Sequence, residues 1–235
     1  MKTQGITKMK VKIIKSYKNA HLAQGLTVVV DVLRAFTTCC FVFGNGAKTI
    51  IPVADTDTAY KMMKTNPQFI SIGERKGLKL SGFNYGNSPA EIENINLKGK
   101  TVILTTSAGT QGIVNALNAD KVITGAFVNA QAVVNYIRKQ KPKIVSFVCT
   151  DDRYEDNEDF MYASFIESHL KDKPLNFHSI KKRLINHPTA EGFLKKPMTK
   201  YSQRDFHLSL DLDRFNFIIA AKKRKDQVYL EKLES

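Results

Sequence analysis

The chain has 235 residues, 43% of them hydrophobic, and its 36 lysine and arginine residues against 22 acidic residues give a formal net charge of +14. This length is sufficient to bury a substantial hydrophobic core. With no run of roughly 18 apolar residues, no apolar leader at the start and only three cysteines, the sequence favours a cytoplasmic protein over a membrane-bound, secreted or disulfide-stabilised one.

Strands and helices are predicted to alternate from the amino end to residue 170. Strands are expected at residues 9–15, 26–32, 48–53, 69–72, 102–104, 121–123 and 144–149. Helices are expected at residues 33–43, 56–64, 113–117, 129–138 and 160–170. This alternation predicts the α/β class, with a parallel or mixed central sheet between two helical layers, the first strand at an edge and the second more central.

The remaining segments are less regular. Residues 76–99 are rich in turn formers and predict a long polar loop, and such loops in compact domains are often functional. Residues 171–200 are basic and interrupted by three prolines, which predicts an exposed excursion that could hold short helices. A helix over 201–212 and a hairpin formed by 215–221 and 227–230 complete a single expected domain over residues 1–235.

Polar side chains follow four of the predicted strands at the point where each strand ends. Asp31 lies near the carboxyl end of the second strand and Arg34 follows it; Glu74 and Arg75 follow the fourth strand, residues 105–110 the fifth, and Asp151 with Asp152 the seventh. Ligands of such folds bind at the carboxyl ends of the strands. We therefore expect these residues to converge on one edge of the sheet.

The turn after the apolar residues 102–104 is composed of hydroxyl residues and glycine. A turn between a strand and a helix start presents unpaired backbone N–H groups that suit a phosphate or another anion. A simple helix cap has the same composition, so both interpretations remain open. The predicted anion-binding residues of this turn are Thr105, Thr106, Ser107, Gly109 and Thr110.

The groups expected at this edge suit the metal-assisted hydrolysis or transfer of a phosphate ester. Carboxylates of Asp31, Glu74 and the acidic run 151–159 could hold Mg²⁺, which prefers oxygen ligands. Arg34 and Arg75 could bind phosphate oxygens with their planar guanidinium groups. Each of these residues also has an alternative, structural role. Asp31 and Arg34 could form an ion pair at a helix start, and Glu74 and Arg75 an exposed loop pair. The acidic run could supply negative charge at a helix terminus.

Several blocks of the sequence resemble, in order, the signature blocks of the 2-phosphosulfolactate phosphatase family. The principal blocks are residues 31–38, 73–75, 82–89 and 105–110. Smaller matches follow at Gly125 with Asn129, Val148-Cys149, Glu158-Asp159 and 212–215, and the resemblance runs from about residue 10 to residue 231.

The resemblance implies an α/β/α phosphatase that requires Mg²⁺ and hydrolyses (R)-2-phospho-3-sulfolactate to 3-sulfolactate and phosphate, a step in coenzyme M biosynthesis. The expected partner is thus a small anionic phosphate ester. Combined with the residues above, the resemblance gives Asp31, Arg34, Glu74 and Arg75 as catalytic residues. It adds Asn87 and Ser88 to the substrate-binding residues of the turn at 105–110. The predicted metal ligands are Asp31, Glu74, Glu158 and Asp159.

The chain departs from the family pattern in the turn at 107–111, where Ala108 and Gln111 replace an asparagine and an arginine. A related small phosphorylated acid is therefore an alternative substrate, and a catalytically inactive relative is an alternative function. The net charge alone favours a binding protein for nucleic acid or another polyanion. Lysine predominates in the basic segments and few aromatic residues accompany it, so we do not expect nucleic acid as the partner; a homo-oligomer is left open.

Overall fold

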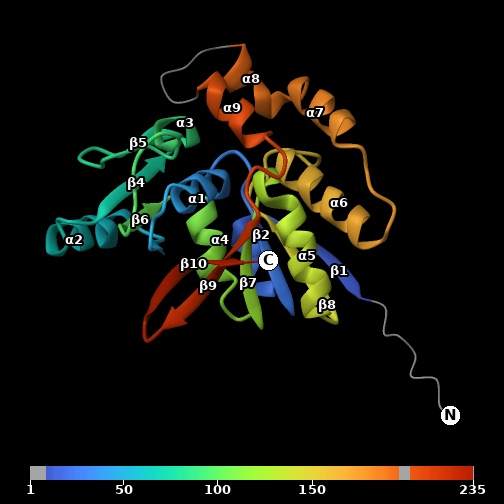
Figure 1. Ribbon diagram of the computed structural model, residues 1–235, viewed down its shortest axis with the longest axis horizontal. Coiled ribbons are helices and arrows are strands. Elements are labelled where there is room, and N and C mark those ends of the chain that lie inside the picture. Colours follow the sequence, from blue (N-terminus) through green and yellow to red (C-terminus); the bar gives the residue numbers. More distant parts are fainter. Residues whose placement is uncertain (1–8, 196–201, 235) are drawn as a thin grey trace.

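The computed structural model describes residues 9–195 and 202–234, which form a mixed α/β structure (Figure 1). The strands are β1 (Lys10–Lys15), β2 (Leu26–Val30), β3 (Thr49–Pro52), β4 (Ile70–Arg75), β5 (Leu78–Lys79), β6 (Thr101–Thr105), β7 (Lys121–Gly125), β8 (Ile144–Cys149), β9 (Phe217–Arg224) and β10 (Gln227–Glu234). The helices are α1 (Ala35–Gly44), α2 (Thr56–Thr65), α3 (Pro89–Ile92), α4 (Gly109–Asn115), α5 (Ala130–Gln140), α6 (Glu158–Leu170), α7 (Phe177–Ile185), α8 (Pro188–Leu194) and α9 (Gln203–Ser209), with 3₁₀ turns η1 (Tyr17–Leu22) and η2 (Phe127–Asn129). The predicted α/β class is confirmed.

The described strands form one sheet in the order β1-β8-β2-β7-β9-β10-β3-β6-β4-β5. One parallel group contains β1, β8, β2 and β7, and a second contains β3, β6 and β4. The hairpin β9–β10 lies antiparallel between the two groups. The predicted hairpin and the predicted edge position of the first strand are thus confirmed. The hairpin joins the two groups in the interior of the sheet.

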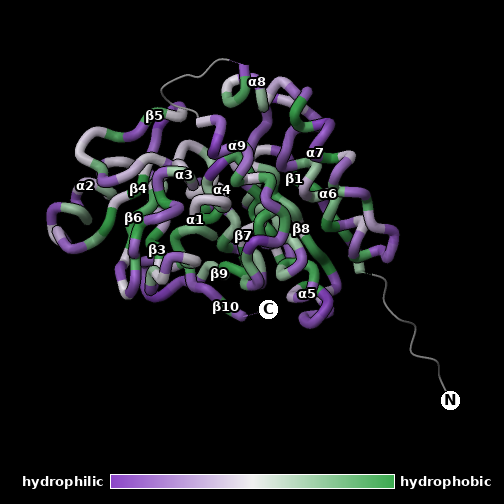
Figure 2. The backbone as a smooth tube through the Cα atoms, turned by 45° about the horizontal axis from the view of Figure 1, so that its top comes forward, coloured by the Kyte–Doolittle hydropathy of each residue, from purple (hydrophilic) through white to green (hydrophobic). Residues whose placement is uncertain are grey.

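Side chains that alternate along the strands pack into hydrophobic clusters on the two faces of the sheet. On one face, Val29 of β2 shares a cluster with α1, α3 and α4. On the other face, Val28 of the same strand shares a cluster with α5 and α6, and Ile103 of β6 packs with α2. Figure 2 shows hydrophobic residues along the strands and hydrophilic ones in the outer loops. The sheet therefore lies between two helical layers, as the alternation of elements predicts.

Helix α1 spans the junction between the two parallel groups. Every residue from Ala35 to Phe43 is buried, and the same cluster includes Val29 of β2, Ile219 of β9 and Ile50 of β3. Apart from Thr37 and Thr38, whose hydroxyls donate to main-chain oxygens, the side chains of α1 are apolar, which is typical of a fully buried helix. The chain leaves α1 at Gly46, whose φ of 90° is readily adopted by glycine. This burial fixes the amino end of α1, and with it the loop that carries Asp31.

The segment 76–99 contains more structure than the predicted loop. Strand β5 forms a short hairpin with β4, and α3 begins after Ser88, whose hydroxyl accepts a hydrogen bond from the Glu91 N–H at 3.2 Å. Pro89 occupies the first helical position, where its missing N–H carries no cost. The cap and the proline are signals of a helix start, but the helix has only one turn.

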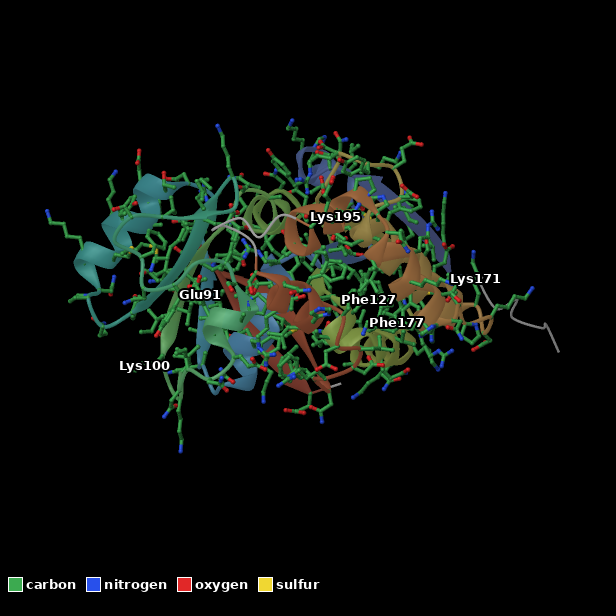
Figure 3. The ribbon with its side chains drawn as sticks, turned by 90° about the horizontal axis from the view of Figure 1, so that it is seen from above. Glu91, Lys100, Phe127, Lys171, Phe177 and Lys195 are labelled. Atoms are coloured by element: carbon green, nitrogen blue, oxygen red, sulfur yellow. The ribbon has the colours of Figure 1, made fainter. Side chains whose placement is uncertain are left out.

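The basic segment 171–200 is folded onto the main body over its described part. Phe177 of α7 packs on Phe127 of η2, with ring centroids 5.1 Å apart (Figure 3). Lysines of this segment such as Lys171 and Lys195 are exposed to solvent. The short helices α7 and α8 agree with the prediction, whereas residues 196–201, including the first residue of the predicted 201–212 helix, lie outside the described residues. Over the described chain, the helices are too short or too polar to cross a membrane.

Candidate active site

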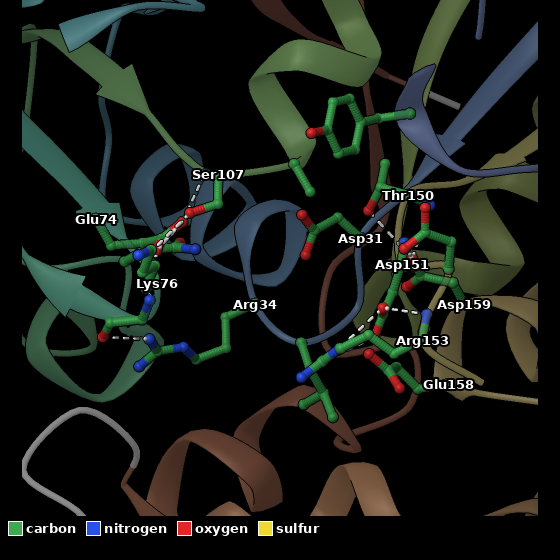
Figure 4. Close-up of a pocket in the computed structure, with 16 residues that line it drawn as sticks. Asp31, Arg34, Glu74, Lys76, Ser107, Thr150, Asp151, Arg153, Glu158 and Asp159 are labelled. Atoms are coloured by element: carbon green, nitrogen blue, oxygen red, sulfur yellow. Dashed lines mark hydrogen bonds and ion pairs between the residues drawn. The ribbon is translucent and has the colours of Figure 1, made fainter. Parts of the chain in front are cut away.

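A pocket of about 440 Å³ opens at the carboxyl ends of the strands. Figure 4 shows Asp31 between two sides, with Glu74, Lys76 and Ser107 on one and Thr150, Asp151 and Glu158 on the other. We call the side formed by residues 150–159 the acidic side, and the side formed by Arg34, Glu74, Lys76, Gly77, Asn87, Ser107 and Ala108 the mixed side. The remaining lining residues are Tyr17 and Leu33. The expected convergence of strand ends is thus observed.

Asp31 follows β2 and holds the start of α1. Its Oδ1 accepts a hydrogen bond from the Ala35 N–H at 2.9 Å, and its main-chain oxygen accepts one from the Phe36 N–H at 3.0 Å. Burial raises the pKa of the Asp31 carboxyl to about 7, and repulsion by Glu74 and Asp151 acts in the same direction. Its Oδ2 has no hydrogen-bond partner among the described residues. A Cβ on Gly109 would lie 2.7 Å from this oxygen, so glycine permits the close approach of α4.

The acidic side includes two adjacent carboxyl groups at the start of α6, Glu158 and Asp159, which differ in their contacts. Asp159 accepts hydrogen bonds from the N–H groups of Val32 (2.9 Å), Thr150 (3.0 Å) and Asp151 (3.2 Å), and so ties the end of β2 to the end of β8. Glu158 is 2% exposed, and its Oε2 has no hydrogen-bond partner among the described residues. Burial, with repulsion by Asp151, raises the pKa of Glu158 to about 7. Asp159 therefore shapes the acidic side, and Glu158 brings an uncommitted oxygen to it.

Glu74, on the mixed side, is a carboxylate surrounded by donors. Its Oε1 accepts a hydrogen bond from the Ser107 N–H at 2.6 Å. Its Oε2 accepts hydrogen bonds from the Gly77 N–H at 2.7 Å and the Ser107 hydroxyl at 3.0 Å. These bonds tie the β4–β5 turn to the β6–α4 turn. Glu74 therefore fixes two loops of the pocket, with most of its acceptor capacity already used.

Arg34 reaches the mixed side from the loop that precedes α1. Its Nη1 donates to Asp205 of α9 at 2.7 Å, and both side chains are almost fully buried. Asp205 also accepts hydrogen bonds from the Ser88 hydroxyl at 2.6 Å and the Ala90 N–H at 3.0 Å. A buried carboxylate with three donors holds the guanidinium in a defined orientation. The predicted residue Ser88 thus lies behind Arg34 and contacts the same carboxylate.

The structure brings seven of the predicted residues into the lining of the pocket: Asp31, Arg34, Glu74, Asn87, Ser107, Glu158 and Asp159. The other six are not among the lining residues: Arg75, Ser88, Thr105, Thr106, Gly109 and Thr110. Their roles in binding or catalysis stay predictions.

Arg75 and the hydroxyls of the β6–α4 turn are engaged with the protein. Arg75 donates to the carbonyl oxygens of Glu74 and Ala54 and to the hydroxyl of Thr105. Thr106 and Thr110 bond each other, since the N–H of each donates to the hydroxyl of the other at 3.0 and 3.1 Å. These bonds stabilise the ends of β4 and β6 and the start of α4. The Thr106 hydroxyl therefore accepts a hydrogen bond from an N–H in the first turn of α4, which is the capping role that the composition of this turn also allowed.

Several residues that line the pocket, or contact its lining, carry no sequence signal strong enough to find them. Lys76 stands in a short turn among other lysines, and Asp205 lies 171 positions from the arginine it contacts. Arg153 lines the acidic side and forms an ion pair with Asp151 at 2.7 Å. Asp151 follows a predicted strand, which places it at the correct edge of the sheet but does not separate it from its acidic neighbours.

The donor set of the pocket suits a hard divalent cation. The lining contains six carboxyl groups, Asp31, Glu74, Asp151, Asp152, Glu158 and Asp159, against three cationic side chains, Arg34, Lys76 and Arg153. Over the described part of the chain, no group of three or more His, Cys, Asp or Glu residues is arranged to hold a metal ion. Mg²⁺ needs only one or two carboxylates because water and substrate oxygens complete its coordination. Asp31 Oδ2 and the orphaned Glu158 Oε2 are the free oxygens that fit this requirement.

The family comparison gives one result over most of the chain. The family model described as 2-phosphosulpholactate phosphatase matches residues 12–221. A relative from Caldicellulosiruptor saccharolyticus is 31% identical over 217 residues, which cover 85% of this chain and 87% of the relative. A relative from Clostridium perfringens strain SM101 is 36% identical over 183 residues, which cover 74% of each chain. A relative from Carboxydothermus hydrogenoformans is 37% identical over 168 residues, which cover 70% of this chain and 69% of the relative. All three are described as probable 2-phosphosulfolactate phosphatases.

Proposed function

The chain belongs to the 2-phosphosulfolactate phosphatase family and is thus a phosphoric monoester hydrolase, and from this premise we propose that it hydrolyses (R)-2-phospho-3-sulfolactate, or a closely related phosphorylated acid, with Mg²⁺ as cofactor. The products would be 3-sulfolactate and phosphate. The observation that carries the proposal is the division of the pocket into an acidic side and a mixed side, on either side of Asp31.

The acidic side supports a cation site. Asp31 and Glu158 each combine burial, a pKa raised to about 7 and a carboxyl oxygen without a hydrogen-bond partner in the described structure. A divalent cation would compensate the repulsion between these groups and Asp151. We assign Asp31 and Glu158 as the residues that hold Mg²⁺. Bound there, the ion would polarise the phosphoryl group and favour deprotonation of the attacking water.

Asp159 and Glu74 support the same site by fixing the loops around it. The oxygens of both carboxylates accept hydrogen bonds from backbone N–H groups of two different loops. Such contacts orient the residues that touch the ligand and keep their positions fixed during the reaction. The sequence predicts both as metal ligands, and a share of that role is compatible with their remaining lone pairs.

The mixed side supports the binding of an anion. Arg34 is held by Asp205, yet its guanidinium also lines the pocket, where it can donate to phosphate oxygens. Asn87 is 5% exposed and lines the same side. A phosphoryl group between the two sides would meet a cation site on one and fixed donors on the other. This arrangement stabilises the negative charge of the transition state without reorganisation.

The test is a phosphate-release assay on purified protein with Mg²⁺, first with chelator and then with excess ion. The substrates are (R)-2-phospho-3-sulfolactate and a panel of phosphorylated carboxylic acids. We expect release that depends on Mg²⁺ and is fastest for the sulfonate. Asp31→Asn should strongly reduce release, whereas Asp152→Asn, a change at an exposed carboxyl of the same pocket, should retain most of it.

Two outcomes would contradict the proposal. Full activity after complete chelation would remove the cation from the reaction. A folded protein that releases phosphate from no member of the panel would favour an inactive relative, the alternative that Ala108 and Gln111 suggest.

A further inference from the structure

The turn between β4 and β5 places a lysine at the edge of the pocket. Lys76 and Gly77 form its two central residues, with φ values of 54° and 80°, and Arg75 pairs with Leu78 across it. Two central residues with positive φ are the hallmark of a tight two-residue hairpin. The Lys76 N–H donates to the Ser107 hydroxyl at 3.1 Å, and the Gly77 N–H donates to Glu74 at 2.7 Å. The backbone of Lys76 is therefore tied to Ser107, and the turn that carries it is tied to Glu74 through Gly77.

The three cationic residues of the pocket differ in their ion pairing. Arg34 is paired with Asp205 and Arg153 with Asp151, each at 2.7 Å. The ammonium group of Lys76 forms no ion pair within residues 9–195 and 202–234, although the side chain lines the pocket beside Glu74 and Ser107 (Figure 4). A lysine ammonium is a flexible point charge that can follow an anion without a fixed geometry. Lys76 is therefore available for a group that is not part of the protein.

We propose that Lys76 binds the second acidic group of the substrate, the sulfonate or carboxylate that does not react, and thereby selects phosphate esters that carry such a group. This inference rests on the proposed function and names the residue that sets its substrate class. Lys76 lies on the mixed side, across the pocket from Glu158 on the acidic side. A phosphoryl group near Asp31 would leave the rest of a small phosphorylated acid free to extend toward the β4–β5 turn.

The charges of the pocket give a physical reason for this selection. A phosphate ester with a further acid group brings at least two separate negative charges into a lining that already holds six carboxyl groups. The cation site can compensate only the charge beside it. A second acid group on the other side would be repelled by Glu74 unless a cation stands next to it. Two cationic side chains lie on the mixed side, and Arg34 is already paired with Asp205. Lys76, which forms no ion pair in the described chain, is the one available for that group.

The experiment compares two variants on two substrates. Lys76→Asn removes the charge and suits the positive φ of the turn, since asparagine adopts that conformation readily. Lys79→Asn removes an exposed lysine from the same hairpin, outside the pocket, and serves as the matched control. The substrates are (R)-2-phospho-3-sulfolactate and isopropyl phosphate, which has no second acid group.

We expect Lys76→Asn to lower kcat/KM for the sulfonate substrate about 10-fold, mainly through KM, because an exposed charge-assisted contact is lost. Its kcat/KM for isopropyl phosphate should stay within about twofold of wild type, and its Tm should not fall. Lys79→Asn should leave kcat/KM for both substrates unchanged. Lys76→Arg, which keeps the positive charge, should retain most of the preference for the sulfonate substrate. An equal loss on both substrates, or no loss on either, would overturn the inference.

Direct binding separates this inference from the proposed function. Calorimetry with 3-sulfolactate measures affinity without any turnover. If wild type binds 3-sulfolactate about 10-fold more tightly than Lys76→Asn but hydrolyses no phosphate ester, the proposed reaction fails while the role of Lys76 stands. If the two proteins bind it equally, Lys76 does not recognise the acid group, whatever the activity.

Discussion

The acidic and mixed sides of the pocket hold carboxyl groups of the same kind in opposite environments. On the mixed side, Glu74 accepts hydrogen bonds from three donors of two neighbouring turns. On the acidic side, Glu158 is equally buried, but one oxygen has no partner in the described structure, and the charge that affects its pKa most is the like charge of Asp151. Glu74 is thus satisfied by the protein, whereas Glu158 is left to be satisfied by something else.

This difference shows that carboxylates at one edge of a sheet are not equivalent metal ligands. Burial raises the pKa of the Glu158 carboxyl because it penalises the charged form, and one of its oxygens has no partner in the described structure to offset that cost. Buried ionised groups persist only where they are paired or coordinate a metal. The acidic side therefore has a physical requirement for a cation that the mixed side does not share.

The largest expected effect lies at Asp31, between the two sides. Asp31→Asn removes the carboxylate that both holds the start of α1 and offers Oδ2 to the pocket. We expect kcat to fall about 100- to 10,000-fold, the range found when a central catalytic group is lost. The amide oxygen can still accept from the Ala35 N–H, so Tm should not decrease. A phosphate-release assay measures kcat, and a thermal melt measures Tm. A folded variant that is fully active would show that Asp31 is only a helix cap.

The two glutamates give the most direct test of the comparison. Glu158→Gln should raise the Kd for Mg²⁺ about 10- to 100-fold, because a charged ligand is lost, while the buried carboxyl no longer penalises folding. Glu74→Gln should leave the Kd for Mg²⁺ within a few-fold but lower stability by about 1–3 kcal/mol, because its three donors lose a charged acceptor. Calorimetry measures the Kd for Mg²⁺ of each variant, and chemical denaturation measures its stability. Equal weakening of Mg²⁺ binding by both variants would make Glu74 a ligand, as the sequence predicts.

The two predicted catalytic arginines provide a second contrast. Arg34 lines the pocket, whereas Arg75 donates to main-chain oxygens and Thr105 behind it. Arg34→Lys should cost about 1–3 kcal/mol of transition-state binding, or about 10- to 100-fold in kcat/KM, because lysine lacks the planar fork. Arg75→Lys should lower Tm and retain most of kcat/KM. The reverse pattern would place Arg75 in the reaction and Arg34 in the scaffold.

The smallest expected effect is a pH dependence that arises from Asp31 and from Glu158 on the acidic side. Between pH 4 and 7 the folded protein keeps protons on Asp31 and Glu158, whose pKa values are about 7, while the unfolded chain releases them near pH 4. The folded state binds more protons in this range, so stability without Mg²⁺ falls as pH rises from 4 to 7 and levels off above it. Mg²⁺ must displace these protons, so its stabilising effect should grow over the same range.

Thermal melts across this range, with chelator and with excess Mg²⁺, measure both slopes. Glu158→Gln is the control, because it should reduce the fall in stability between pH 4 and 7. A metal-free protein whose Tm rises steadily over that range would contradict the assignment of buried, uncompensated carboxyl groups to this side.

Much of the fold follows from the sequence because the signals are local. The apolar run at 26–32 predicts a strand and the run at 33–43 a buried helix, and the structure has the strand at Leu26–Val30 and the buried helix at Ala35–Gly44. Each depends on residues within one or two turns of chain. The alternation of these elements then predicts which edge of the sheet carries the site. For the same reason, local signals are sufficient to assign Asp31, Glu74 and Glu158 to that edge.

Only the tertiary structure decides which groups remain free in the pocket. Asp205 holds Arg34 across 171 positions of sequence, and Glu74 is saturated by donors from two turns that meet only when β4 and β6 pair. Whether a carboxylate is satisfied depends on the donors around it in space, and sequence separation carries no information about them. The sequence by itself therefore determined the elements, the edge and the chemical types of the site. The packing of the two parallel groups around α1 determined which oxygens of Asp31 and Glu158 face the pocket uncommitted, because burial and hydrogen-bond satisfaction arise only when distant segments come together.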